Sequence, residues 1–328
     1  MSELIVTNGD AAADLLAAAG VRSKIMPWRD VLHEGPIVPA PSLAALSNRR
    51  AAYLSERFGI PYADARADLL MRDAVILAHG MFDTITIWLE HDLYDQLQLL
   101  QILNVLHEER RHEGVSLVQA DDFLATQSPE TVLRFAEAAV DLDATMLETG
   151  ASLWKALEMP TPEGLAAQLR STTGAFRFLR PALGRFVEEL PALRGGLSRS
   201  ERTMVAAIAP GGLTPREVFT RLLASEDAPF MGDWSAFRLL DDLANASEPL
   251  VGGLETIFPC QGEPGDVEAY LASPLSITPF GRSVLAGEAD AITVNGVDRW
   301  WAGTHLRGHD CWRWDAHSRR LVPPGGAA

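Results

Sequence analysis

The segment that most constrains the fold is residues 84–103, where a strand pattern changes into a helix pattern. Apolar side chains alternate along residues 84–89, which is typical of a β-strand, and leucines then recur at helical spacing. Ligands of open α/β sheets bind where strands end and helices begin. The sequence therefore predicts an α/β fold with a site at this changeover. Four polar residues lie there: Glu90, His91, Asp92 and Asp95.

The first 120 residues have the pattern of a Rossmann-like parallel sheet. Short apolar runs at residues 4–7 and 24–26 flank an alanine-rich helix over residues 11–19, which Asp10 is expected to cap. Two more helices, the strand and helix described above, and a last strand give the order β-α-β-α-α-β-α-β. Alternating strands and helices are characteristic of α/β folds. We expect residues 1–120 to form the domain that carries the site.

Two further regions follow this domain. Residues 121–195 are expected to form a helical block, either packed on the first domain, which we favour, or standing alone. Residues 196–328 have the order of a winged-helix-like α+β domain, because three predicted helices precede short strands. The tail of this region is predicted to form short β-strands rich in tryptophan.

The net charge of −16 at pH 7 bears on the partners of the chain. Affinity for nucleic acid depends largely on Lys and Arg, so binding to nucleic acid is not expected. The helix predicted at residues 234–244 would read DNA in a winged helix, but it holds one Arg and two Asp. We expect this region to pack or to contact protein. A regulator that binds DNA or a protein partner is the alternative function.

The remaining composition indicates a globular protein of the cytoplasm. Hydrophobic residues make up 47% of the chain and charged residues 22%, which allows a sizeable core. The two cysteines, Cys260 and Cys311, cannot form a framework of disulfides. We expect no signal peptide and no membrane association, because no apolar run approaches the length of a membrane span. The oligomeric state is left open, a homodimer included.

The loop at residues 27–36 is rich in functional groups. Arg29 could clamp a carboxylate or phosphate, and His33 could act as a general base that Glu34 orients. Two of the loop's other polar or aromatic residues, Trp28 and Asp30, are also candidates for ligand binding. The alternative is a solvated loop whose tryptophan packs against the core.

This loop is expected to share one end of the sheet with the turn after the first strand. That turn contains Asn8, Gly9 and Asp10. Gly9 would let a ligand approach the backbone, and the helix that follows would favour an anion at its N-terminus.

The changeover at residue 90 offers a second set of candidates. Asp92 is a natural helix N-cap, and Asp95 suits the first helical turn, whereas Glu90 and His91 have no such structural explanation. Tyr94 and Gln96 could line a pocket. Alternatively, Gln96, Gln98 and Gln101 form a solvated helix face.

A metal is not established by the sequence. Oxygen ligands from aspartate and glutamate, with His33 or His91, would suit Mg²⁺ or Mn²⁺ better than zinc. The carboxylates considered for such a site are Asp10, Asp30, Glu90 and Asp92. The chain has no GxGxxG after its first strand, no phosphate-binding P-loop and no GxSxG, so the commonest dinucleotide, nucleotide and serine hydrolase motifs are absent.

Three blocks resemble the characteristic blocks of the bacterial DUF1835 family, a domain of unknown function. They begin at Asn8, Trp28 and Trp88, and the resemblance covers about the first 120 residues. Residues 277–287 and 295–306 are similar to the tail often fused to that domain. The resemblance implies no established activity, so it assigns no role to any residue.

These patterns together predict an enzyme, or a ligand-binding protein, for a small anionic molecule that resembles a phosphate or a nucleotide. Hydrolysis or group transfer is the expected reaction class. The candidate catalytic residues are His33, Glu34, Glu90 and His91, and the candidate ligand-binding residues are Asn8, Gly9, Asp10, Trp28, Arg29, Asp30, Asp92, Tyr94 and Gln96.

Overall fold

The computed structural model describes residues 2–169 and 176–326, and it divides into two compact units. Unit 1 comprises Met1–Tyr53, Tyr62–Gly184 and Ala302–Thr304. Unit 2 comprises Leu54–Pro61, Arg185–Trp301 and His305–Ala328. Most of the predicted middle block, residues 121–195, therefore belongs to the same unit as the first 120 residues. Among the described residues, no helix is both long and apolar enough to cross a membrane.

Unit 1 is built on a five-stranded sheet with the order β2-β1-β3-β4-β5. The first four strands are parallel and β5 is antiparallel to β4. The strands are β1 (Glu3–Thr7), β2 (Lys24–Pro27), β3 (Thr84–Leu89), β4 (Val115–Gln119) and β5 (Val140–Asp141). The predicted α/β class and parallel sheet are confirmed. From β1 the chain adds β2 on one side, and it later adds β3 on the other side of β1. The strand order therefore reverses between β1 and β3, and the carboxyl ends of these two strands form a topological switch point.

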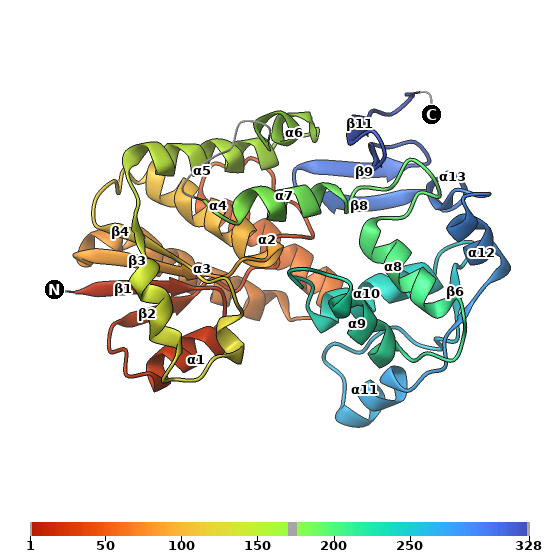
Figure 1. Ribbon diagram of the computed structural model, residues 1–328, viewed down its shortest axis with the longest axis horizontal. Coiled ribbons are helices and arrows are strands. Elements are labelled where there is room, and N and C mark those ends of the chain that lie inside the picture. The colour runs from red at the N-terminus through yellow and green to blue at the C-terminus, as the bar shows by residue number, and fades with distance from the viewer. Residues whose placement is uncertain (1, 170–175, 327–328) are drawn as a thin grey trace. The chain divides into compact units, whose positions relative to one another are not determined.

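Helices cover both faces of this sheet (Figure 1). On one face, Ile5 of β1 and Trp88 of β3 pack with Leu16 of α1 (Asp10–Ala18) in one apolar cluster. Side chains that alternate with these point to the other face, where α4 (Leu93–Glu108) lies. The helices α2 (Leu43–Phe58) and α3 (Tyr62–Leu77) fall between β2 and β3 in the chain.

Helix α4 is buried on nearly every side, which the sequence did not predict. Helix α5 (Ala144–Leu157) covers it, and a Cβ at Gly150 of α5 would come within 2.6 Å of the Leu103 Cβ. The absence of a side chain at Gly150 therefore permits the close approach. The alternative that Gln96, Gln98 and Gln101 form a solvated face is wrong, because all three are at most 1% exposed.

The middle block departs from the all-helical prediction in two places. A 3-10 helix, η3 (Val132–Ala138), stands where an α-helix was expected, and β5 adds an antiparallel strand to the sheet. Helix α6 (Glu163–Leu169) follows α5, and α7 (Leu179–Val187) contains Pro181 near its start, where a missing N–H does not break the helix. The sequence pattern predicts a helix over residues 175–189; its first residue lies outside the described residues, and the observed helix begins at Leu179.

Three of the helices of unit 2 pack together with a short antiparallel strand pair. The core of this part joins Met204, Val218 and Leu240, one from each helix, with Val251 and Ile277 of the strands. Short paired strands make up the tryptophan-containing tail, as predicted, and the last pair, β10 and β11, is antiparallel. The elements are α8 (Arg199–Ile208), α9 (Pro215–Ala224), α10 (Asp233–Ala244), β6 (Val251–Gly252), α11 (Pro264–Leu271), β7 (Ser276–Ile277), α12 (Pro279–Ala286), α13 (Ala291–Asn295), β8 (Val297–Trp301), β9 (Thr304–Gly308), β10 (Arg313–Asp315) and β11 (Arg320–Val322).

Candidate functional site

The candidate site lies at the switch point, where β1 and β3 end side by side. Thr7 pairs in register with Trp88, so the residues that follow these strands, Asn8 and Glu90, leave the same edge of the sheet. Helix α4 starts three residues after Glu90, with Asp92 as its N-cap: the Asp92 carboxylate accepts a hydrogen bond from the Asp95 N–H at 3.2 Å. The predicted capping role of Asp92 is confirmed.

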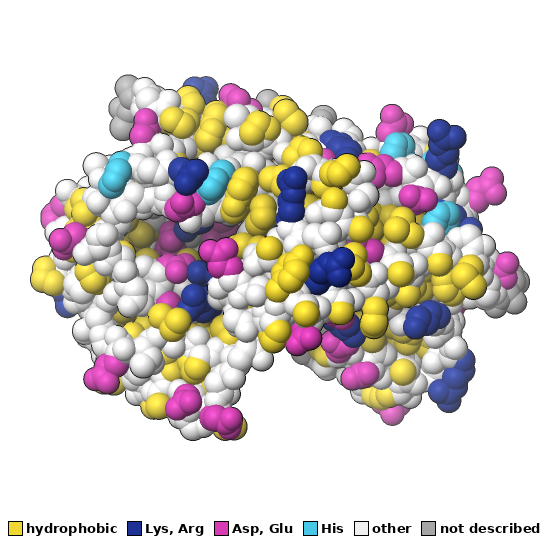
Figure 2. All heavy atoms as spheres, turned by 180° about the vertical axis from the view of Figure 1, so that it is seen from behind, with side chains coloured by type: hydrophobic (Ala, Val, Ile, Leu, Met, Phe, Trp, Pro, Cys, Tyr) yellow, Lys and Arg dark blue, Asp and Glu magenta, His cyan; other side chains and the backbone are white. Residues whose placement is uncertain are grey.

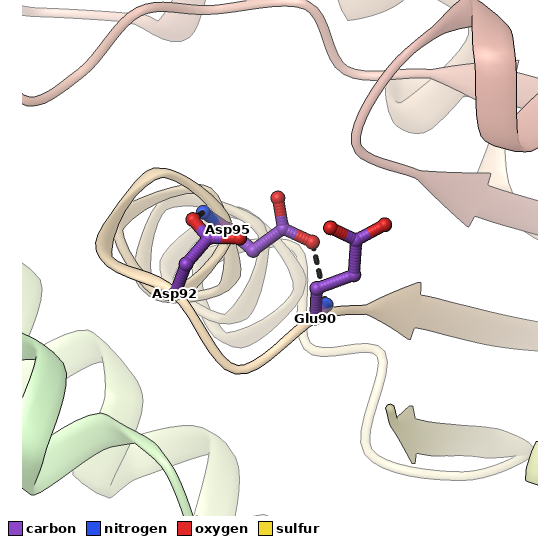
Figure 3. Close-up of side chains that lie close together, drawn as sticks. All are labelled: Glu90, Asp92 and Asp95. Atoms are coloured by element: carbon purple, nitrogen blue, oxygen red, sulfur yellow. Dashed lines mark hydrogen bonds between the residues drawn. The ribbon is translucent and has the colours of Figure 1, made fainter. Parts of the chain in front are cut away.

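Three buried carboxylates meet at this point. Glu90, Asp92 and Asp95 each offer an oxygen atom, and these atoms all lie within 4.8 Å of one another. The Asp95 side chain lies between the other two (Figure 3). It accepts hydrogen bonds from the Glu90 N–H at 2.5 Å and from Asn8 Nδ2 at 3.0 Å. Glu90 Oε1 accepts a hydrogen bond from the Leu124 N–H at 2.8 Å. We refer to Glu90, Asp92 and Asp95 as the carboxylate triad.

Burial raises the pKa of every member of the carboxylate triad. The exposed fractions of Glu90, Asp92 and Asp95 are 4%, 3% and 0%. Loss of hydration, followed by repulsion from Glu90, raises the pKa of Asp92 to about 7. The same two kinds of cause, burial first and then the charges of Asp92 and Glu90, raise the pKa of Asp95 well above its usual value. Three charged carboxylates cannot stay this close in a buried place, so the triad must hold protons or a cation.

Gln96 borders the carboxylate triad from the second turn of α4. It is fully buried, and its Nε2 donates a hydrogen bond to the Glu90 carbonyl oxygen at 2.7 Å. Its Oε1 has no hydrogen-bond partner within the described part of the chain. Leaving a buried acceptor unsatisfied costs about 1–3 kcal/mol. The orphaned oxygen therefore needs an explanation.

Tyr94 connects the triad to the loop at residues 27–36. The ring of Tyr94 meets the ring of His33 edge-on, with centroids 6.2 Å apart. Burial, and then the charge of Asp95, raises the pKa of the Tyr94 phenol. His33 is buried, and its Nε2 lies 4.0 Å from Glu34 Oε1, while Glu34 Oε2 accepts a hydrogen bond from Tyr53. His33 and Glu34 therefore lie close together, although 4.0 Å is longer than a hydrogen bond, and the Tyr94 ring links His33 to the triad's helix.

His91 points into an aromatic cluster. Its ring centroid lies 5.0 Å from that of Phe123 and 5.8 Å from that of Phe178. Burial lowers the pKa of the His91 imidazole, which favours the neutral form. A neutral imidazole packed between two phenyl rings has an ordinary packing role, which the sequence did not suggest.

Two residues of the loop belong to a buried ionic network. Asp30 Oδ1 accepts a hydrogen bond from Arg50 Nη2 at 2.9 Å, and Arg72 Nη1 lies 3.6 Å from Asp30 Oδ2. Trp28 donates a hydrogen bond to Gln101 Oε1 at 2.7 Å, and the Arg72 guanidinium lies 4.4 Å from its ring centroid. The structure therefore places Trp28 and Asp30 in the interior with arginine partners, and it does not bring them to the triad.

The predicted anion clamp at Arg29 is already engaged. Arg29 donates to both carboxylate oxygens of Asp10, at 2.5 and 2.9 Å, and also pairs with Asp68. Its φ of 55° is unusual for a residue with a side chain. The expectation that Asp10 caps α1 is wrong, because Gly9 is the N-cap and Asp10 is the first helical residue. An anion at this helix end would compete with the Asp10 carboxylate.

The sequence did not identify several residues that shape the site. Asp95 was explained as a first-turn acid, although its burial and its contact with Asn8 make it the centre of the triad. The Leu124 N–H and the partners Arg50 and Arg72 come from distant segments, so no local pattern could reveal them. One sequence feature could have pointed to the site: polar residues interrupt the apolar pattern of α4, and in the structure these polar residues are buried.

Comparison with known proteins assigns neither a family nor a function to the chain. No protein family model matches the chain, and a search of curated proteins found no similar sequence. The resemblance to the DUF1835 family therefore stays a prediction.

Proposed function

We propose that unit 1 carries an enzymatic site, or a ligand-binding site of enzymatic type, for a small anionic molecule that resembles a phosphate or a nucleotide. Hydrolysis or group transfer is the proposed reaction class. One observation carries the proposal: three buried carboxylates with raised pKa values converge at a topological switch point of a parallel sheet. Open α/β sheets bind ligands at this position, and shifted carboxyl groups cluster at active sites.

Asp92 is the group best suited to move a proton. A carboxyl group with a pKa of about 7 exchanges protons readily near neutral pH, as general acid–base catalysis requires. A protonated carboxyl group also donates a hydrogen bond, so a triad that holds protons can meet an anionic oxygen without charge repulsion. Asp92 therefore takes the role that the sequence assigned to His33 or Glu90, and Tyr94 places His33 near the same helix.

A thermal-shift screen tests this function. We expect inorganic phosphate, a nucleotide or a sugar phosphate to raise the melting temperature, because a ligand that binds only the folded state stabilises it. The variant Asp92→Asn should bind the same ligand with a changed affinity and lose about 10²–10⁴-fold of any turnover.

Asp143→Asn is the matched control, since Asp143 is an exposed aspartate that caps α5 through the Met146 N–H. The asparagine can still cap either helix. An equal loss of turnover in both variants, or no stabilisation by any of these anions, would count against the proposal.

A second candidate function is a non-enzymatic regulator with a winged-helix domain in unit 2. The order of three helices and an antiparallel strand pair favours it, although α11 separates β6 from β7. The helix that would read DNA, α10, has its Arg238 paired with Asp241 at 3.1 Å, and its Asp242 paired with Arg57. On the face shown in Figure 2, Lys and Arg side chains are scattered among acidic ones. A protein partner fits this surface better than DNA does.

Fluorescence anisotropy with a labelled random-sequence DNA duplex separates the two kinds of partner. We expect no saturable binding at low salt, because the charge of α10 is acidic and its arginine is paired. Binding that weakens steeply as salt is raised would instead support a DNA-binding regulator.

Three further expectations remain proposals. Membership of the DUF1835 family rests on the three sequence blocks in unit 1. A cytoplasmic location is consistent with Cys260 and Cys311, both of which are free thiols. A homodimer rests on no contact of the described chain, and sedimentation analysis would decide it.

A further inference from the structure

We infer that the carboxylate triad and Gln96 together bind one divalent cation that prefers oxygen ligands, of the class of Mg²⁺, Mn²⁺ and Ca²⁺. The cation would bind the same three carboxylates that carry the proposed function, but its test uses the metal alone, so the two proposals can fail separately.

The spacing of the donor atoms fits a single ion. The three carboxylate oxygens lie within 4.8 Å of one another. Two ligands on opposite sides of Mg²⁺ are about 4.2 Å apart, and on Ca²⁺ about 5 Å apart, whereas adjacent ligands are closer. One oxygen from each of Glu90, Asp92 and Asp95 can therefore coordinate the same ion after small side-chain movements. With no sulfur or imidazole donor in the triad, the site favours hard cations over zinc or copper.

Gln96 supplies the second, independent observation. Its Nε2 is committed to the Glu90 carbonyl oxygen, which can only accept a hydrogen bond, so the orientation of the amide group is fixed. The other polar atom of the amide, Oε1, is buried and has no hydrogen-bond partner among the described residues. The hydrogen bond from Nε2 to the Glu90 carbonyl oxygen keeps this amide next to the triad. A neutral amide oxygen is a common ligand of Mg²⁺ and Ca²⁺. Coordination would satisfy an acceptor that hydrogen bonding leaves unsatisfied.

The charged groups that act on the triad are acidic, and negative charge favours the binding of a cation. The groups that act on its members through charge are acidic: Asp122 acts on Glu90, Glu90 acts on Asp92, and both Asp92 and Glu90 act on Asp95. Asn8, which donates a hydrogen bond to Asp95, is partly exposed, so the triad has a solvent-accessible residue at its edge. A bound ion would replace the protons that the triad otherwise holds, so the proton-transfer role proposed for Asp92 belongs to the metal-free triad.

Titration of the EDTA-treated full-length chain with MnCl₂, followed by calorimetry and by the electron paramagnetic resonance signal of free Mn²⁺, tests the inference. We expect saturable binding of one ion, competition by MgCl₂, and a rise in melting temperature without any organic ligand. Glu90→Gln should weaken Mn²⁺ binding at least about tenfold. This variant keeps the Oε1 atom that accepts from Leu124, so it should fold and should melt no lower than the parent chain when metal is absent.

Two matched controls separate coordination from general effects. Asp122→Asn removes a nearby exposed charge outside the triad, and it should change Mn²⁺ affinity far less than Glu90→Gln does. Gln98→Leu removes a second buried glutamine of α4 whose Nε2 also donates to a carbonyl, that of Asp30, and whose Oε1 also lacks a described partner. We expect Gln96→Leu to weaken Mn²⁺ binding several-fold and Gln98→Leu to leave it unchanged.

Each outcome decides a separate part of the inference. No saturable Mn²⁺ or Ca²⁺ binding by the folded parent chain would overturn the site. Equal effects of Gln96→Leu and Gln98→Leu would remove Gln96 from the ligand set. Metal binding without stabilisation by any phosphate compound would leave the cation site intact and contradict only the proposed function.

Discussion

Replacing Asp30 with Asn should lower the free energy of unfolding by about 3–5 kcal/mol, because it leaves the buried Arg50 without its counter-charge, whereas Arg72 keeps its ion pair with Asp73 at 2.8 Å. Asp30 and Arg50 are both completely buried, and Arg72 is 4% exposed. Arg50 donates to Asp30 through Nε at 3.0 Å and Nη2 at 2.9 Å. An asparagine retains the shape of the side chain but not the charge.

Urea denaturation monitored by circular dichroism measures this loss. The control is Asp68→Asn, which removes the partner of Arg29 in an ion pair whose two side chains are 41% and 37% exposed. Solvent screens such a pair, so we expect a change below about 1 kcal/mol. Similar losses of unfolding free energy in the two variants would contradict a stabilising role of the buried Asp30–Arg50 ion pair. Should Asp30→Asn fail to fold, Arg50→Met offers a second test of the same network, because it leaves Arg72 shared between Asp30 and Asp73.

The stability of the protein should fall as pH rises from about 4 to about 7, and Asp92 should be a large part of the cause. Its folded-state pKa of about 7 lies above its ordinary value of 3.8, so in this interval the folded state keeps a proton that the unfolded state releases. The unfolded state then binds fewer protons, which makes the slope of unfolding free energy against pH negative. A rise of roughly three pKa units corresponds to about 4 kcal/mol.

The comparison of Asp92→Asn with the parent chain isolates this contribution. Glu90, Asp95 and Asp241 have raised pKa values and act in the same direction. The lowered pKa of His91 acts in the opposite direction below about pH 6.5, and the lowered values of Glu189 and Asp290 do so at more acidic pH. Chemical denaturation in metal-free buffer at several pH values should show a shallower decline for Asp92→Asn. Parallel pH profiles would show that Asp92 does not hold a proton in the folded state.

Local sequence patterns predicted the elements of the site well. The alternation in residues 84–89 and the leucines that follow specified β3 and α4, and Asp92 was recognised as a cap because capping depends on neighbouring residues alone. The edge of the sheet was also predicted, since successive strands joined by helices run parallel and end on one side.

The roles of individual side chains could not be predicted in the same way. Trp28, Arg29 and Asp30 looked alike as polar or aromatic loop residues, yet Asp30 is buried with Arg50 and Arg29 pairs at the surface with Asp10. Nothing in the loop distinguishes them. The difference arises because α2 and α3 bring Arg50 and Arg72 to one side of the loop.

The sequence by itself determined that a strand-to-helix changeover at residues 89–93 would carry acidic groups to the edge of a parallel sheet. Only the tertiary structure decided which of those groups meet. Helix α5 buries α4, and the Leu124 N–H and Asn8 arrive from other segments to hold Glu90 and Asp95 beside Asp92. Burial and mutual proximity set the pKa values and the cation-binding capacity of carboxylates, and both depend on contacts between residues far apart in the chain.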